Sequence, residues 1–220
     1  MALITTVLFD LDGTLTDPKV GITKSMVYAL ERLGQPAPLP DDLVWCIGPP
    51  LHKNFEKLLG GTERVSEGVA YYRERYADLG MYENELYSGI QGTLEHLKQS
   101  NLRLIVATSK YNVIATQVIA HFKLDIYFDA VYGSESDGTR GDKTELIAYL
   151  LARESLAPSS CLMIGDRKHD MIGAKNNGVR GIGAGWGYGS PEELLQAGAE
   201  TVLRNPTSIS AHILAERGAL

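Results

Sequence analysis

Short apolar runs alternate along this chain with longer segments whose apolar residues recur at helical spacing. Strands that alternate with helices in this way are typical of βαβ units, which build a parallel sheet covered by helices. The sequence therefore predicts an α/β fold with a Rossmann-like parallel sheet core. The expected strands are Ile4–Phe9, Leu102–Ala107, Ala130–Tyr132, Cys161–Ile164, Gly181–Ala184 and Thr201–Leu203. The expected helices are Gly89–Gln99, Tyr111–Phe122, Lys143–Glu154, Asp170–Asn176 and Pro191–Gln196.

One region interrupts the alternation. From Pro18 to Tyr87 the sequence has no convincing strand pattern, only helix-like segments separated by Gly and Pro. We interpret this region as a helical cap domain, residues 17–87, inserted into an α/β core domain made of residues 1–16 and 88–220. The expected hinges are Thr16–Pro18 and Tyr87–Gly89.

Glycine and proline mark the ends of the helices in the inserted region. The first helix is expected to end at Gly34, because glycine readily adopts the left-handed conformation at helix C-termini. Asp41 or Asp42 is a candidate N-cap for the next helix. Two further helices are predicted at Leu51–Leu59 and Ser66–Leu79.

The composition excludes several classes of protein. With 44% hydrophobic and 22% charged residues, the chain is typical of a globular protein. Its formal net charge of -6 lacks the basic excess that binding to a phosphate backbone requires, so no nucleic acid polymer is expected as a partner. Cys46 and Cys161 match no disulfide framework, and Met1–Asp10 lacks the basic start of a signal peptide. We therefore expect a cytoplasmic protein that does not bind a membrane.

Polar residues follow directly after the expected strands. Asp10–Thr14 follows the first strand and Thr108–Lys110 the second, while Lys143 opens the helix after the third. Asp166 follows the fourth strand, and Asp170 comes shortly after it. Ligands of open α/β sheets bind beyond the carboxyl ends of the strands. We therefore expect these side chains to meet at one edge of the sheet.

This set of side chains suits phosphoryl transfer assisted by a metal ion. Four carboxylates in one cleft repel each other unless a cation neutralises them, and an all-oxygen set suits a hard ion such as Mg²⁺. An ammonium and hydroxyl groups stabilise the oxygens of a transferring phosphoryl group. One carboxylate can attack phosphorus to form an acyl phosphate, and a second carboxyl group can protonate the leaving oxygen.

At these positions the chain resembles the haloacid dehalogenase-like hydrolase superfamily, in its branch of phosphoglycolate phosphatase-like and 5′-nucleotidase-like enzymes. Asp10–Leu15 (DLDGTL) matches the first motif of the superfamily, and Thr108 is similar to the second. Lys143 corresponds to the third motif and Gly165–Asp170 to the fourth. The resemblance covers nearly the whole chain, and four motifs in this order at the expected strand ends are a specific signal.

The resemblance implies a catalytic role for several of these residues. Asp10 would be the nucleophile, and Asp12 the general acid and base. Thr108 would donate a hydrogen bond to the phosphoryl oxygens, and Ser109 beside it would also bind the substrate. Lys143 would balance the charge of the phosphoryl group and orient Asp10.

The resemblance also implies a Mg²⁺ site. Asp166 would hold the ion together with the carboxylate of Asp10 and the backbone carbonyl of Asp12. Asp170 would support the metal shell, directly or through water. In an alternative interpretation, Asp170 is a helix N-terminal acid that stabilises the helix dipole and does not serve the metal.

The inserted region corresponds to the mobile cap that such enzymes close over the substrate. Within it, Ile47–Pro50 resembles the loop with which relatives contact the substrate, so Gly48 is a candidate substrate-binding residue. The alternative for this loop is a simple helix-breaking link. Tyr72 and Tyr76, at helical spacing, are more typical of packing, and Arg73 of a solvated face.

The sequence thus predicts a Mg²⁺-dependent phosphatase that hydrolyses a small phosphate monoester through an aspartyl-phosphate intermediate. Thr144 after Lys143 favours the 5′-nucleotidase-like branch, although phosphoglycolate and a nucleoside 5′-monophosphate both remain candidate substrates. A sugar phosphomutase of the same superfamily would use the same Asp10 and Asp12. A signalling module that merely accepts a phosphoryl group is a third alternative, but such a module needs neither Asp12 nor a large cap.

Overall fold

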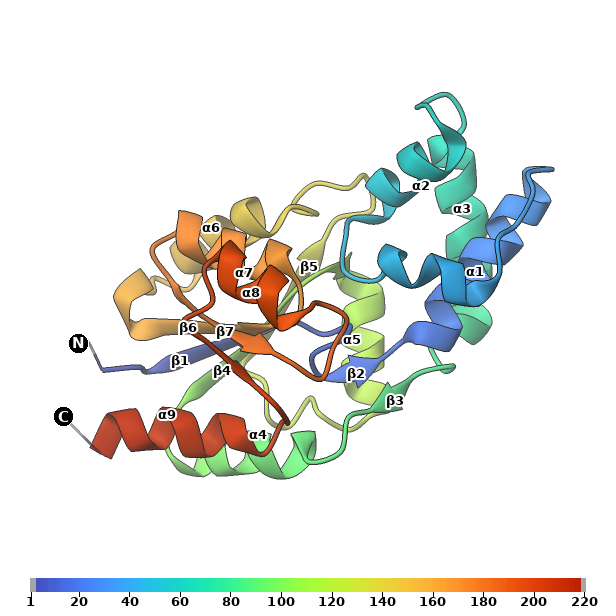
Figure 1. The fold of residues 1–220 in the computed structure, drawn as a ribbon. Helices are drawn as coiled ribbons and strands as arrows, with labels where there is room; N and C mark the ends of the chain where they lie inside the picture. Colours follow the sequence, from blue (N-terminus) through green and yellow to red (C-terminus); the bar gives the residue numbers. More distant parts are fainter. Residues whose placement is uncertain (1–2, 219–220) are drawn as a thin grey trace.

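The computed structural model describes residues 3–218, which form an α/β fold around one parallel sheet (Figure 1). The sheet has six strands in the order β5-β4-β1-β6-β7-β8, and each neighbouring pair is parallel. The predicted fold class is therefore confirmed. The strands are β1 (Thr6–Phe9), β4 (Arg103–Tyr111), β5 (Ala130–Ser134), β6 (Cys161–Gly165), β7 (Arg180–Ala184) and β8 (Thr201–Leu203). Residues 1–2 and 219–220 of the predicted core domain, including the start of Met1–Asp10, lie outside the described residues.

Helices cover both faces of the sheet, so the core has three layers. Successive side chains of a strand point to opposite faces. Val7 and Phe9 of β1 accordingly pack into one apolar cluster, with α4, α5 and α9, while Leu8 packs into the other, with α6, α7 and α8. The first group of helices is α4 (Ile90–Gln99), α5 (Asn112–His121) and α9 (Ser208–Gly218). The second group is α6 (Lys143–Arg153), α7 (Lys168–Asn176) and α8 (Pro191–Ala197), and the 3₁₀ turn η3 (Pro158–Ser160) precedes β6.

Some bounds of the core elements differ from the predicted ones. Strand β4 continues past Ala107 to Tyr111, so Thr108 is still within the strand. Helix α7 begins at Lys168 because the Asp170 carboxylate accepts a hydrogen bond from the backbone N–H of Arg167 and caps the first turn. Helix α9 was not predicted, although Ile209 and Ile213 are buried at helical spacing.

A helical insertion lies between β1 and β4, as predicted, and is called the cap insertion below. Figure 1 shows its helices α1, α2 and α3 grouped to one side of the sheet and the helices that cover it. The bounds of the cap domain at residues 17 and 87 remain a prediction. The elements of the insertion are α1 (Lys19–Arg32), η1 (Pro40–Cys46), α2 (Leu51–Leu59), α3 (Val65–Arg75) and the π-helical turn η2 (Tyr76–Gly80).

The ends of the helices in the cap insertion agree only partly with the sequence prediction. Gly34 adopts a left-handed conformation after α1, with φ of 69°. Asp41 and Asp42 are not N-caps, because the 3₁₀ helix η1 starts at Pro40 and the two acids lie within its first turn. The single helix predicted at Ser66–Leu79 is α3 followed by η2.

A short antiparallel ribbon joins the cap insertion to the core. Strand β2 (Thr16–Asp17) pairs with β3 (Glu85–Leu86), where the sequence predicted only hinges and helix-like segments. Two residues per strand are too few to show the alternation of apolar and polar residues by which a strand is predicted. The ribbon pairs the segment that enters the insertion with the segment that leaves it.

Cys46 and Cys161 are both buried and form no disulfide. Burial raises the pKa of the Cys46 thiol to about 12. Within residues 3–218, no helix combines the length and the apolar character needed to cross a membrane.

Candidate active site

The carboxyl ends of three adjacent strands bring the predicted site residues together. Strand β1 lies between β4 and β6, so Asp10 after β1 is flanked by Thr108 in β4 and Asp166 after β6. All three side chains are buried. Because the sheet is parallel, residues far apart in the sequence meet here, as the alternation of strands and helices predicts.

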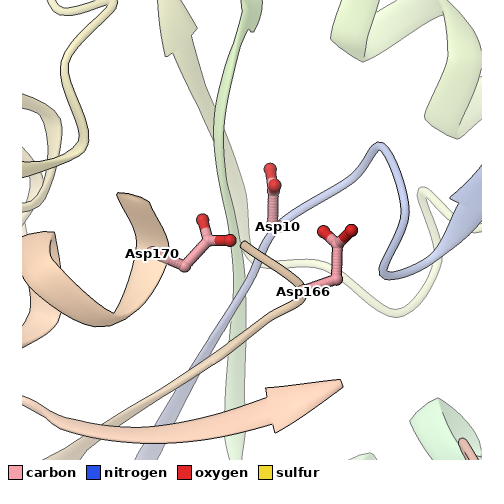
Figure 2. Close-up of side chains that lie close together, drawn as sticks. All are labelled: Asp10, Asp166 and Asp170. Carbon is pink, nitrogen blue, oxygen red and sulfur yellow. The ribbon is translucent and has the colours of Figure 1, made fainter. Parts of the chain in front are cut away.

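Three carboxylates form a compact acidic group. Asp10, Asp166 and Asp170 each offer an oxygen, and these oxygens lie within 4.8 Å of one another. Figure 2 shows the three carboxyl groups side by side, from the segment after β1, the segment after β6 and the start of α7. The exposed fractions of the three residues are 3%, 0% and 1%, respectively. Negative groups buried so closely require a compensating cation, so this donor set fits a hard divalent ion.

Burial has a strong effect on the titration of this group. Desolvation, together with the charges of Asp170 and Asp10, raises the pKa of Asp166 well above its ordinary value. Desolvation likewise raises the pKa of Asp170 to about 6, although Lys143 acts in the opposite direction. The carboxylate of Asp12 is not part of the acidic group, so Asp12 offers the predicted metal site only its backbone carbonyl.

Asp166 is held by polar contacts on both of its oxygens. The Thr14 hydroxyl donates to Oδ1 at 3.2 Å, and the backbone N–H of Tyr188 donates to Oδ2 at 2.8 Å. Glycines make room for this carboxylate: a Cβ on Gly13 would lie 2.2 Å from Asp166 Oδ2, and one on Gly187 would lie 2.3 Å from Asp166 Cβ. Gly187 belongs to the glycine-rich segment after β7, which thus packs directly against the site.

Lys143 joins two members of the acidic group. It is the first residue of α6, whose N-cap Asp142 accepts hydrogen bonds from the backbone N–H groups of the first turn. Its Nζ lies 2.8 Å from Asp10 Oδ1 and 2.5 Å from Asp170 Oδ1. Burial by itself would lower the pKa of Lys143, but the two carboxylates outweigh burial and raise it. Asp170 therefore caps a helix, pairs with Lys143 and belongs to the acidic group at the same time.

Asp12 has a cationic partner that the sequence analysis missed. Its Oδ2 lies 2.7 Å from Nζ of Lys110, while its buried Oδ1 has no hydrogen-bond partner among residues 3–218. Burial raises the pKa of Asp12 even though Lys110 lowers it. A carboxyl group with a raised pKa is suited to donate a proton. Lys110 lies two residues beyond Thr108 in β4, within the same polar run after the second expected strand, and this position could have pointed to it.

A cavity of about 730 Å³ lies between the core and the cap insertion. Asp10, Asp12, Thr108 and Ser109 line it from the core. The cap insertion contributes Gly48, Pro49, Tyr72, Arg73 and Tyr76 to the lining. The predicted substrate-binding residues Ser109 and Gly48 thus face the same space as Asp10. Lys143 and Asp166 lie behind this surface, buried in the core.

The cap residues on the cavity wall make closer contacts than the sequence suggested. Gly48 has a φ of 103°, and a Cβ there would lie 2.8 Å from Arg167 Cγ, so the glycine is required at this close approach. Arg73 is not on a solvated face: it is half-buried and donates to the carbonyl of Ser136 at 2.8 Å. Tyr72 and Tyr76 are buried and stacked, as predicted for packing residues, with ring centroids 5.2 Å apart.

The site combines carboxylates, a buried ammonium and hydroxyl groups at the strand ends, beneath a helical insertion. This combination is typical of phosphoryl-transfer enzymes with a Rossmann-like core and a helical cap. The model of the family described as haloacid dehalogenase-like hydrolase matches residues 7–184. The chain belongs to this family and is one of its phosphatases.

Individual proteins support this assignment. The chain is 52% identical over 189 residues to a 5′-nucleotidase of Pseudomonas aeruginosa, and the matched region covers 86% of each chain. It is 36% identical to the tyrosine-protein kinase PtkA of Mycobacterium tuberculosis, over 92% of this chain and 69% of that one. The crystal structure of a predicted phosphatase from Clostridium acetobutylicum superimposes with a TM-score of 0.94 at 40% identity and covers 97% of this chain and 100% of its own.

Proposed function

We propose that this phosphatase hydrolyses nucleoside 5′-monophosphates, with Mg²⁺ as its cofactor and a phosphoryl group carried transiently on Asp10. One observation carries the proposal. Asp10 belongs to the buried acidic group, pairs with Lys143 and lines the cavity, all at once. A carboxylate in this position is available to a phosphate ester in the cavity and has cationic charge beside it.

The reaction takes place in two steps. In the first, a carboxylate oxygen of Asp10 attacks phosphorus, the ester P–O bond breaks, and its electron pair goes to the leaving oxygen, which takes a proton from Asp12. In the second step, Asp12 takes a proton from water, the water oxygen attacks phosphorus, and the Asp10 carboxylate is released with inorganic phosphate. Atoms and charges balance because the proton that Asp12 gives up in the first step returns to it in the second.

Other residues stabilise the phosphoryl group and the metal. Thr108 donates a hydrogen bond to the phosphoryl oxygens, and Lys143 balances their charge while it holds Asp10. The carboxylates of Asp10 and Asp166 and the Asp12 carbonyl, with support from Asp170, would hold Mg²⁺, which would supply further positive charge to these oxygens.

The substrate class rests on three observations. The P. aeruginosa relative that is 52% identical is a 5′-nucleotidase. The cavity of about 730 Å³ falls in the range of pockets that hold drug-sized ligands, a class to which a nucleoside monophosphate belongs by size. Phosphoglycolate would fill only a small part of it. The cap residues Tyr72 and Pro49 on the cavity wall are aromatic and apolar, so they suit a nucleoside better than the carboxylate of phosphoglycolate.

A substrate panel tests the proposal. Phosphate release is measured with Mg²⁺ for nucleoside 5′-monophosphates, phosphoglycolate, sugar phosphates and an aryl phosphate. The expected result is the highest kcat/KM for a nucleoside 5′-monophosphate. A preference for phosphoglycolate would contradict the substrate class but leave the phosphatase in place. Conversion of a sugar phosphate to its isomer without phosphate release would instead show a phosphomutase.

A further inference from the structure

Lys110 and Asp12 form a pair at the border between the core and the cap insertion. Lys110 lies near the end of β4, and its Nζ is 2.7 Å from Asp12 Oδ2, with only 7% and 11% of the two side chains exposed. We propose that Lys110 is a positioning residue that fixes the Asp12 carboxyl group by Oδ2 and so makes Oδ1 the oxygen that exchanges the proton with the leaving group. This inference rests on the proposed function, in which Asp12 is the general acid.

The two oxygens of Asp12 have different surroundings. Oδ2 accepts a charge-assisted contact from Lys110, and an oxygen engaged in this way is a poor place for a proton. Oδ1 is buried and has no hydrogen-bond partner among residues 3–218, although Asp12 lines the cavity. A buried polar atom without a partner is costly, and a site keeps one where a ligand supplies the partner. The leaving oxygen of a phosphate ester is such a partner.

The proton transfer then involves a defined atom. As the P–O bond breaks, its electron pair passes to the leaving oxygen, which takes the proton from Oδ1. In the second step Oδ1 accepts a proton from the attacking water. Lys110 keeps its own protons throughout, so it acts only by holding Oδ2. General acids work only when the proton lies within hydrogen-bond reach of the leaving atom, so a rotated carboxyl group would lose much of its effect.

The cap insertion holds Lys110 in turn. Nζ of Lys110 donates to Oη of Tyr76 at 2.9 Å and lies 4.4 Å from the centroid of the same ring. Tyr76 opens the π-helical turn η2 and stacks on Tyr72, so its ring is itself well fixed. A residue of the cap insertion therefore sets the position of Lys110, which sets that of Asp12. Such an arrangement makes the orientation of the acid depend on the placement of the cap.

A different role for Lys110 predicts different kinetics. Lys110 also lines the cavity, so it could act as a cationic contact for the phosphate group of the substrate. Loss of such a contact would raise KM for every ester by a similar factor. Loss of a positioning residue for the acid has another signature, because esters with an acidic leaving group need little protonation while alkyl esters need much.

The experiment compares kcat/KM of Lys110→Met and wild type on 4-nitrophenyl phosphate and on an alkyl phosphate, because kcat/KM reports only the steps up to release of the alcohol and kcat also includes hydrolysis of the common intermediate. We expect kcat/KM for the alkyl ester to fall by about 100-fold, the lower end of what general acids contribute, and kcat/KM for the nitrophenyl ester by no more than about threefold. Lys110→Arg should restore part of the loss, since a guanidinium can also hold Oδ2. Lys123→Met, at an exposed position of the core, removes the same charge and should behave like wild type.

Tyr76→Phe tests the contribution of the cap and serves in place of Lys110→Met if that variant does not fold. Tyr76→Phe should lose more activity on the alkyl ester than on the nitrophenyl ester, by a smaller factor than Lys110→Met. If the two losses in Tyr76→Phe are equal, the role of the cap is overturned. Equal losses of kcat/KM on both esters in Lys110→Met would overturn the positioning role and would instead indicate a contact to the phosphate group. Failure of the wild type to release phosphate from any ester would instead overturn the proposed function.

Discussion

The ammonium of Lys143 and the carboxylate of Asp10 form a buried ion pair, with 2.8 Å between Nζ and Oδ1 and less than a twentieth of either side chain exposed. The same Nζ lies 2.5 Å from Asp170, so one cation serves two buried anions. Lys143 is therefore important for the fold as well as for the reaction. A buried ion pair contributes little by itself, but removal of one partner leaves an uncompensated charge.

Replacement of Lys143 by Met should lower the free energy of unfolding by about 3 kcal/mol in the metal-free protein, because two buried carboxylates lose their cation. Denaturant unfolding measures this change. Lys98→Met is the matched control, since Lys98 pairs with Asp129 at the surface with about a third of each side chain exposed. Surface pairs of this kind contribute at most about 1 kcal/mol. Equal losses in both variants would contradict the assignment of Lys143 to a buried cluster.

The affinity for Mg²⁺ should fall as the pH drops through about 6. Burial raises the pKa of Asp170 to about 6 from an ordinary value of 3.8, and it raises the pKa of Asp166 as well. Protons therefore compete with the metal in this range. Titration calorimetry at a series of pH values from about 5 to about 8, a range that includes this pKa, measures the change in Mg²⁺ affinity. An affinity for Mg²⁺ that is independent of pH would contradict the metal site.

The free energy of unfolding of the metal-free protein should change with pH in the opposite direction to the Mg²⁺ affinity, because the same carboxyl groups are involved. A carboxyl group whose pKa is higher in the folded state favours folding below its unfolded value, and this contribution is lost as the pH rises through its folded value. Asp170 should thus make the metal-free protein less stable as the pH rises from 3.8 through about 6. In Asp170→Asn, thermal unfolding should show a smaller fall over this range. A fall of the same size in the variant would show that other groups cause it.

Gly187→Ala should weaken metal binding. A Cβ at this position would lie 2.3 Å from Asp166 Cβ and 2.4 Å from the carbonyl oxygen of Gly13, so one of these segments must move. We expect at least a tenfold loss of Mg²⁺ affinity by titration calorimetry, in the range seen when the supports of a metal ligand are removed. Gly92→Ala is the control: it lies exposed in α4 with open space around its Cβ and should stabilise the helix by about 0.5–1 kcal/mol. Wild-type affinity in Gly187→Ala would contradict the close packing at Asp166.

Asp12→Ala should slow alkyl esters far more than activated aryl esters, because only the former depend on protonation of the leaving oxygen. A difference of about 100-fold between the two losses in kcat/KM is expected, because kcat/KM reports only the steps up to release of the alcohol. The measurement is the dependence of kcat/KM on the pKa of the leaving alcohol. Equal losses across the series would contradict the role of Asp12 as general acid.

Much of this arrangement could be predicted from the sequence, because it follows from local patterns. Apolar runs gave the six strands of the sheet, and polar residues after the runs gave Asp10, Thr108 and Asp166 at adjacent strand ends. The resemblance to one family then ordered these residues into roles. The cap insertion was also predictable, since a long region without strands stands between the first two strands of the core.

The remaining features depend on contacts between segments that are distant in the sequence. Lys110 is distinctive only once Tyr76 of the cap insertion and Asp12 of the core are both beside it. The burial of Arg73 depends on Ser136 and Tyr111 of the core, so its helical spacing alone suggested a solvated face. The ribbon of β2 and β3 is too short to show a sequence pattern. It forms where the chain leaves the core for the insertion and returns from it, so its pairing depends on two segments that are distant in the sequence.

The central claim is that Asp10 attacks phosphorus in a Mg²⁺-dependent hydrolysis. Its most direct test is phosphate release from nucleoside 5′-monophosphates by wild type and by Asp10→Asn, with Mg²⁺ and with excess chelator. Asparagine keeps the shape of the side chain and an oxygen for Lys143, so the variant should fold with a melting temperature near that of wild type. Attack by Asp10 predicts phosphate release by the wild type with Mg²⁺ and without chelator, and no release by the variant. Release by Asp10→Asn at the wild-type rate, or full release by the wild type in chelator, would contradict it.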